Sequence, residues 1–307
     1  MLDMNFLPTN TGVADIQIFN RPSTITNLQW YTWRKPRGKS MCNIFALSGG
    51  GGGGGGFGGI VGAARGGGAS GGGSGSARVT IPLVFLPDTL YIQVGPGGNG
   101  GASNTAGSTL TPALNSFVSI YPDTSATNVL LASGTNVPTG GGAGTAAAGG
   151  TAGSVPSVAT IGIMPLAGLG HFDLIVGIVG VAGGSIANPG VVTAIPATSA
   201  LCMPGSGGGG CTGTAQAGGG VTAIASSHLS MWAPVAAAAG VNGSPGPLLW
   251  KPFFSYGGLG GGSSNATTGG EGGYGAYGSG GGGGGAGTAA AGRGGDGGNG
   301  LVIITCW

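Results

Sequence analysis

The sequence predicts a mainly β and irregular fold: a glycine-rich, β-sandwich-like domain with packed tracts of polyglycine II type and little helix. Glycine makes up 78 of the 307 residues, and the string GGGAGTAAAG occurs twice, at 140–149 and 283–292. A flexible linker needs glycine composition only, whereas an exact repeat of glycine spacing indicates a fixed place for each glycine. Hydrophobic residues reach 40% and charged residues only 5%, so the chain can bury a core. We therefore expect ordered tracts.

The first 48 residues differ from the rest and predict an N-terminal attachment segment, followed by a glycine-rich β domain over 49–307 with irregular loops at about 102–255. This segment holds five of the nine cations, which are Arg21, Arg34, Lys35, Arg37 and Lys39. ADIQIFN and NLQWYTW alternate as strands do, KPRGKS turns the chain, and MCNIFALSG begins a strand that runs into glycine.

The remaining strands lie between the glycine tracts. VTIPLVFLPDTLYIQVG predicts two strands, SFVSIYPDTSATNVLLASG a hairpin around Pro122 and Asp123, and LVIITCW a terminal strand. MWAPVAAAAG allows a helix of one or two turns. The apolar stretch 157–184 contains Pro165, His171 and several glycines, so two buried strands explain it better than a membrane span. MLDMNFLPTN lacks the regions of a signal peptide.

The glycine tracts have a physical solution in the left-handed threefold polyglycine helix. This helix rises about 3.1 Å per residue and makes no internal hydrogen bonds, so neighbouring tracts must pair its N–H and C=O groups. Ordering glycine costs about 1 to 2 kcal/mol per residue or more. Dense bonding and apolar strands that clamp both ends of each tract are therefore expected.

A basic group lies beside aromatic residues in the N-terminal segment. Arg34, Lys35, Arg37 and Lys39 fall within six residues, near Trp30 and Trp33. Basic residues beside aromatics can bind nucleic acid or an anionic surface. A solvated turn or a docking contact to an acidic partner needs fewer assumptions, and these six residues are our docking candidates.

Two tyrosines and four cysteines complete the candidate residues. Tyr274 and Tyr277 in GGEGGYGAYGSGG are presented on glycine loops, where they can stack on a glycan or receptor or wedge between tracts. The cysteines allow the pairs Cys202–Cys211 and Cys42–Cys306, against an alternative of four free thiols.

Catalytic and metal-binding patterns are missing from the sequence. Two histidines, His171 and His228, and seven scattered acids support neither a catalytic triad nor a carboxylate pair. Gly38-Lys39-Ser40 imitates the end of a phosphate-binding loop, but Trp33 stands where that motif requires glycine. We expect no enzyme activity, no metal site and no cofactor.

The two ends of the chain carry a family resemblance. WYTWRKPRGKSMCNIFALSGGGGGGGG and the closing GGNGLVIITCW resemble the glycine-rich domains of bacteriophage tail fibres and adhesins. The resemblance implies an extracellular virion-surface protein, a homotrimer with a polyglycine scaffold, whose partners are other virion proteins and a host receptor or glycan. Nucleic acid and membrane insertion are not expected. The alternative is a self-assembling subunit of a capsid appendage or extracellular filament without a receptor. The low charge also favours an obligate oligomer.

Overall fold

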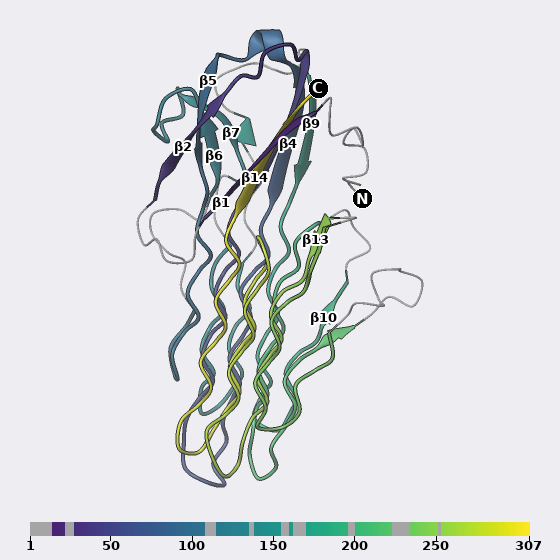
Figure 1. Ribbon diagram of the computed structural model, residues 1–307. Helices are drawn as coiled ribbons and strands as arrows, with labels where there is room; N and C mark the ends of the chain where they lie inside the picture. Colours follow the sequence, from purple (N-terminus) through teal and green to yellow (C-terminus); the bar gives the residue numbers. More distant parts are fainter. Residues whose placement is uncertain are drawn as a thin grey trace.

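A computed structural model describes residues 14–21, 28–107, 115–134, 138–154, 160–161, 170–195, 200–222, 234–250 and 253–307. Two facing sheets form one end of the molecule, and wavy extended tracts form the other (Figure 1). Within the described residues the helical content is one short 3-10 turn, η2 (Leu83–Phe85). The predicted mainly β, sandwich-like fold with little helix is confirmed.

The first sheet joins the two ends of the chain. Its strand order is β1-β14-β3-β4-β9, and every neighbouring pair is antiparallel. The strands are β1 (Asp15–Asn20), β14 (Leu301–Cys306), β3 (Met41–Leu47), β4 (Ser76–Pro82) and β9 (His171–Ile175). β14 is buried along its whole length, as its unbroken apolar run LVIITC requires. The predicted terminal strand therefore lies inside the sheet.

The second sheet faces the first and carries the predicted hairpin. Its order is β2-β5-β6-β7-β8, again antiparallel, with strands β2 (Trp30–Arg34), β5 (Thr89–Gln93), β6 (Phe117–Ser119), β7 (Val129–Ala132) and β8 (Thr160–Ile161). The β6–β7 connection is organised by Asp123, which accepts hydrogen bonds from the Ser125 hydroxyl and backbone and from the Asn128 amide. These hydrogen bonds, that from the Ser125 hydroxyl first, hold the pKa of Asp123 below its ordinary value.

The hydrophobic core fills the space between the two sheets. Trp33, Leu90 and Leu131 from the second sheet pack in one cluster with Ile44 and Ile304 from the first. Two short pairs lie outside the sandwich: β10 (Thr193–Ala194) with β11 (Val221–Thr222), and β12 (Leu248–Trp250) with β13 (Phe253–Ser255). The core thus holds together strands from both ends of the chain.

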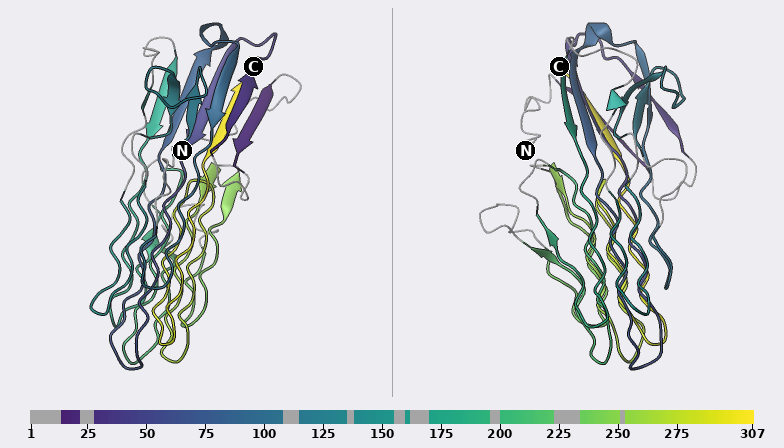
Figure 2. Two further views of the ribbon diagram at one scale, coloured as in Figure 1. Left: turned by 90° about the vertical axis from the view of Figure 1, so that its left-hand side faces the viewer. Right: turned by 180° about the vertical axis from the view of Figure 1, so that it is seen from behind.

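Below the sandwich the chain runs back and forth as extended tracts that lie side by side in all three views (Figures 1 and 2). Five tracts are buried at every residue and form the centre of the bundle: 49–56, 66–75, 204–211, 257–264 and 279–287. Peripheral tracts surround them and carry a larger side chain at regular intervals. In 269–278, for example, two glycines separate Glu271 from Tyr274, and both side chains face outward.

Hydrogen bonds in the bundle repeat every three residues, as a polyglycine II packing requires. The N–H groups of Gly50, Gly53 and Gly56 donate to the carbonyls of Gly298, Gly295 and Gly292, in an antiparallel sense. The carbonyls of Gly51, Gly54 and Phe57 accept from Gly281, Gly284 and Gly287, in a parallel sense. In total this tract bonds to residues 66–72, 98–105, 141–144, 281–287 and 292–298. Each tract is therefore a threefold helix whose bonds all go to neighbours.

The repeated GGGAGTAAAG marks a turn in each of its two copies. Each copy descends in one tract, turns at the end far from the sandwich, and begins the next tract. In the first copy the Thr145 N–H donates to the Ala148 carbonyl, and the Thr145 hydroxyl accepts from the N–H groups of Ala147 and Ala148. The sequence TAAA thus supplies a side-chain-capped turn in the first copy. In the second copy the Thr288 N–H and hydroxyl both donate to the Thr267 carbonyl of a neighbouring turn, so the repeat places a turn at both positions with different hydrogen bonds.

Several expectations need correction or fall outside the described residues. The predicted attachment segment is not separate, because β1 and β3 flank β14 and β2 lies in the second sheet. The stretch 176–184 is not part of a strand. It is an extended tract of the polyglycine bundle, and its carbonyls accept hydrogen bonds from Gly67 and Ser70. The helix suggested for MWAPVAAAAG is absent from 234–239, and its first residues lie outside the described part of the chain.

Candidate functional site

A basic pocket opens at the sandwich end, where β2 turns into β3. It is a hollow of about 580 Å³ lined by Arg34, Lys35, Pro36, Arg37, Gly38, Lys39, Asp88 and Thr89. The turn depends on Gly38, whose φ of 75° lies in the left-handed region that favours glycine. Four cations against one carboxylate give the lining an excess of positive charge.

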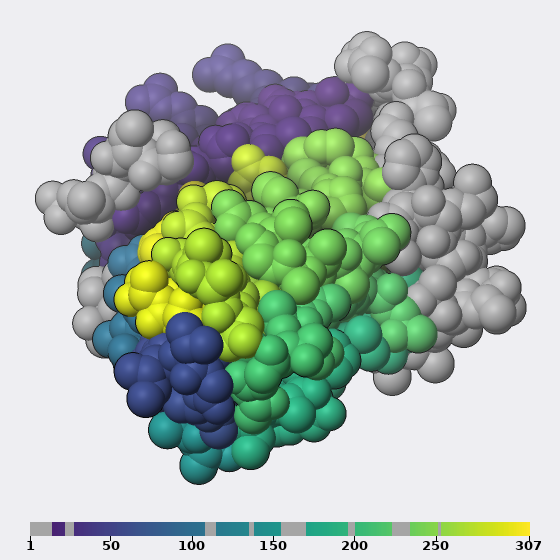
Figure 3. Space-filling view, turned by 90° about the horizontal axis from the view of Figure 1, so that it is seen from below, coloured from purple at the N-terminus to yellow at the C-terminus, as the bar shows by residue number. Residues whose placement is uncertain are grey.

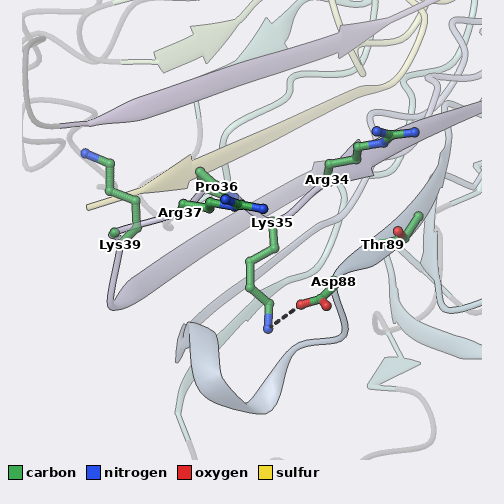
Figure 4. A pocket seen from close by; sticks show the side chains of 8 residues that line it. Arg34, Lys35, Pro36, Arg37, Lys39, Asp88 and Thr89 are labelled. Carbon is green, nitrogen blue, oxygen red and sulfur yellow. Dashed lines mark ion pairs between the residues drawn. The ribbon is translucent and has the colours of Figure 1, made fainter.

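One ion pair fixes the basic turn to the second sheet (Figure 4). The Lys35 Nζ lies 3.3 Å from the Asp88 Oδ1, and the Lys35 N–H donates to the Asp88 carbonyl at 2.9 Å. Arg34 pairs with Thr89 in the β2–β5 ladder. The backbone is thus held in place, while Arg37 and Lys39 extend from the turn on its two sides. Such a pocket suits a carboxylate or another anionic group of a partner.

The two predicted docking tryptophans do not belong to this pocket. Trp33 is fully buried in the core between the sheets. Trp30 lies at the other end of β2, opposite Gln93, whereas the pocket lies at the Arg34–Thr89 end. Alternation along β2 turns Trp33 inward and leaves Arg34 exposed. Docking through Trp33 is therefore wrong, docking through Trp30 stays a prediction, and the pocket itself brings together only the four cations.

The opposite end of the molecule consists of the turns between tracts, and Figure 3 shows it face-on. The turn after the first tract stands in the foreground of that view. It exposes Ile60 and Val61, at 79% and 68% of their surface. The Ala63 N–H donates to the Ile60 carbonyl, and Gly62 has a φ of 81°, as a type II turn needs at its third residue. Two apolar side chains are thus held outward at the tip.

Arg65 supports this turn, and the sequence reasoning missed its role. Its side chain is completely buried. The guanidinium donates to the carbonyls of Ala63 at 3.2 Å and Gly59 at 3.4 Å, to the Asn265 Oδ1 at 2.5 Å, and to the Cys211 Sγ at 3.4 Å. None of these partners is a carboxylate. The arginine therefore joins three neighbouring turns through neutral acceptors, a role visible only once those turns are adjacent.

We expect Arg65→Met to lower the free energy of unfolding by about 2 to 3 kcal/mol, because it leaves buried acceptors without donors. The matched change Arg293→Met should cost less than about 1 kcal/mol, since Arg293 is partly exposed and paired with Asp296. Urea unfolding of both variants tests this. Equal losses would contradict the role assigned to Arg65.

Tyr274 lies within a peripheral tract, whereas Tyr277 lies in the turn that ends it, where the Ser279 N–H donates to the Ala276 carbonyl and Gly278 has a φ of 70°. The expectation of a loop is therefore corrected for Tyr274 alone. Tyr274 is half exposed on the side of the bundle. Tyr277 is partly buried, with its ring centroid 6.2 Å from that of Trp250 and its hydroxyl 3.4 Å from the Asn20 amide. The spacing of three residues places Tyr274 on the same row of the threefold helix as Glu271. Tyr274 therefore presents an aromatic surface sideways, and Tyr277 mainly packs.

Asp296 and Asn299 occupy the corresponding row of the last tract. Their side chains accept hydrogen bonds from the N–H groups of Gly100 at 2.7 Å and Gly97 at 2.9 Å. GGDGGNG is thus a continuous tract that satisfies its neighbour's backbone. Among the described residues no cluster of histidine, cysteine or acidic side chains could hold a metal ion.

All four cysteines are buried and free in the structure. Cys202 and Cys211 stand at opposite ends of one extended central tract, about 28 Å apart at 3.1 Å per residue. A disulfide requires Cα atoms within about 7 Å, so the pairing expected from a closed loop is wrong. Burial raises the pKa of Cys202 to about 12, which keeps it as an unreactive thiol. Cys42 and Cys306, by contrast, are direct cross-strand partners.

The remaining observations concern histidine and the membrane. His171 begins β9, and His228 lies outside the described residues. No helix within the described chain has the length and apolar character needed to cross a bilayer.

Comparison with known proteins agrees with this architecture. A search of curated proteins gave no match to the sequence. A family profile described as "Glycine-rich domain" matches residues 25–307, which include every described strand except β1 and the whole polyglycine bundle. The chain therefore belongs to this glycine-rich domain family.

Proposed function

We propose that this protein is a fibre- or adhesin-type attachment protein on the surface of a virion. In this proposal the basic pocket docks to an acidic site on another virion protein, the bundle acts as a rigid spacer, and the turns at the tip contact a host receptor. The observation that supports it most is the placement of the basic pocket and the apolar turn at opposite ends of an elongated body.

The tip has the features of a contact surface. A small number of exposed apolar side chains adds little to the free energy of the unbound protein. A turn that is already rigid before binding loses less conformational entropy when it binds. Ile60 and Val61 meet both conditions, because Arg65 holds their turn from beneath. The proposed receptor is a protein or glycan of the host surface, and Tyr274 offers a secondary contact on the side.

We further propose that the protein acts as a homotrimer outside the cell. Its few charges provide little mutual repulsion between copies. Nucleic acid binding, membrane insertion and catalysis are not part of the proposal. Sedimentation analysis of the full-length protein should give three times the monomer mass, and a monomer at micromolar concentration would contradict the trimer.

The receptor role predicts a loss of adsorption for Ile60→Glu. A carboxylate at the centre of an apolar contact must lose its hydration, so binding of the labelled full-length protein to host cells should fall at least about tenfold, or roughly 1.4 kcal/mol. Val84→Glu is the matched control, because Val84 is equally exposed, at 79%, but lies in η2 of the sandwich. Equal binding by both variants would show that the turn with Ile60 and Val61 does not contact the receptor. A wild-type protein that binds no host cell would favour the self-assembling subunit.

The docking role predicts the complementary result for the pocket. Arg37→Glu combined with Lys39→Glu reverses two charges on the turn, so incorporation into particles should fall at least about tenfold at low salt. Adsorption of the purified variant to cells should stay unchanged. Normal incorporation, measured by immunoblotting of purified particles, would show that the pocket is not the docking site.

A further inference from the structure

Cys42 and Cys306 are paired across β3 and β14, the two strands that join the start and the end of the glycine bundle. We propose that these two thiols form a cross-strand disulfide on reaction with a small-molecule disulfide such as oxidised glutathione, and that this bond clasps β14 to β3. The proposal concerns the sandwich itself and does not depend on receptor binding.

The hydrogen-bond pattern next to the cysteines fixes the geometry of the pair. Met41 and Trp307 exchange both backbone hydrogen bonds, at 3.0 and 3.1 Å, so they form a hydrogen-bonded pair of the antiparallel ladder. Such pairs alternate with non-hydrogen-bonded ones, in which the Cα atoms are about 4.5 Å apart and the side chains are closest. Cys42 and Cys306, the next pair along, are therefore a non-hydrogen-bonded pair, and this spacing lies within the range that disulfides span.

The side chains also share one environment. Directly opposed residues of an antiparallel pair point to the same face, and both thiols lie in the same core cluster, 0% and 1% exposed. A hydrogen bond joins the two thiols, raising the pKa of Cys42 and lowering the pKa of Cys306. The two sulfurs are thus close enough for either thiol to react with a mixed disulfide formed on the other.

The reaction balances as two thiol–disulfide exchanges. The Cys306 thiolate attacks one sulfur of oxidised glutathione and releases a glutathione thiolate, which leaves a mixed disulfide on Cys306. Cys42 then gives its proton to water, attacks the Cys306 sulfur and releases the second glutathione. The two protein thiols lose two electrons, which reduce one glutathione disulfide to two thiols. The pair lies at the end of the β3–β14 ladder, where local opening gives the oxidant access.

The disulfide would affect both the β sandwich and the polyglycine bundle. A disulfide restricts the unfolded chain more as the closed loop lengthens, and this loop runs from 42 to 306 and contains the whole bundle. The disulfide would also restrain the residues that follow the basic turn, because the N–H groups of Ser40 and Met41 donate to the Trp307 carbonyl. Oxidation should therefore raise the urea midpoint of the full-length protein.

Peptide mapping tests the bond directly. The full-length protein is incubated in reduced or oxidised glutathione, alkylated with iodoacetamide and digested with trypsin without reduction. The proposal predicts that oxidation links peptide 40–65 to peptide 294–307, which contain Cys42 and Cys306. Cys202 and Cys211 fall in another fragment and should remain alkylated. Alkylated Cys42 and Cys306 after oxidation, or links shared equally with Cys202, would overturn it.

Unfolding measurements test the clasp. Cys306→Ser should abolish the rise in urea midpoint on oxidation, whereas the matched variant Cys202→Ser should keep it, since both replaced thiols are buried. If Cys306→Ser fails to fold, the wild-type protein compared before and after oxidation gives the same answer. A linked peptide without any rise in midpoint would disprove the stabilising role.

Discussion

Gly53→Ala is expected to lower the free energy of unfolding by more than about 4 kcal/mol, a loss reserved for severe core defects. A Cβ at this position would lie 2.0 Å from the Gly282 carbonyl oxygen and 2.6 Å from its carbon. Ordinary carbon contacts are about 3.5 to 4.0 Å. Both partners are backbone atoms of buried central tracts, so no side chain can rotate away.

Relaxation by moving the tract would break the bonds that order it. The Gly53 N–H donates to the Gly295 carbonyl, and its own carbonyl accepts from Gly101, both at 2.8 Å. A displaced tract therefore loses pairing with neighbours on several sides, and buried backbone groups without partners are costly. Collagen shows the same dependence on glycine at its crowded axis.

Gly213→Ala is the matched control. No atom lies within 4 Å of a Cβ built there, and Gly213 is not among the described glycines with positive φ. Its effect should lie between zero and a gain of about 1 kcal/mol, from the lower entropy of the unfolded chain. Urea denaturation followed by circular dichroism measures both. A loss below about 1 kcal/mol for Gly53→Ala would show that the bundle is not close-packed.

Trp33→Ala is the second large effect, with an expected loss of about 3 to 5 kcal/mol. Trp33 is the largest of the fully buried side chains, and it packs between the sheets with Leu90 of its own sheet and Ile44 of the other. Removal of its ring leaves a cavity that strands on both sides cannot close without distorting their ladders.

Two further variants separate packing from chemistry. Trp33→Phe should cost much less, since it keeps most of the ring and removes an Nε1–H that has no partner among the described residues. Trp30→Ala should cost about 1 kcal/mol or less, because Trp30 is only half-buried. Equal losses for Trp30→Ala and Trp33→Ala, measured by urea unfolding, would place Trp33 outside the core.

Local patterns predicted most of the elements. Alternation in ADIQIFN, the apolar run LVIITC and the Pro122–Asp123 turn correspond to β1, β14 and the β6–β7 hairpin. Neighbouring residues alone determine such features. Tyr274 and Cys211 show where this fails: the same glycines that make a loop when alone make a straight tract when neighbours accept their bonds.

The candidate sites could be predicted only in part, because they depend on contacts between residues far apart in the sequence. The four cations of the basic turn are adjacent in sequence, so their clustering was predictable, but Asp88 enters the pocket only because β5 pairs with β2. Burial of Trp33 depends on which face of β2 meets the other sheet. Arg65 acquires its role from Asn265 and Cys211, which are far away in the chain.

The sequence by itself indicated that glycine is a building material here, because exact repeats and a large apolar content favour ordered tracts over a mobile linker. It also determined where strands give way to tracts. Only the tertiary structure decided which tracts are neighbours, which residues face outward, and which cysteines meet. The physical reason is that a polyglycine helix has no internal hydrogen bonds, so its conformation and its partners are chosen together.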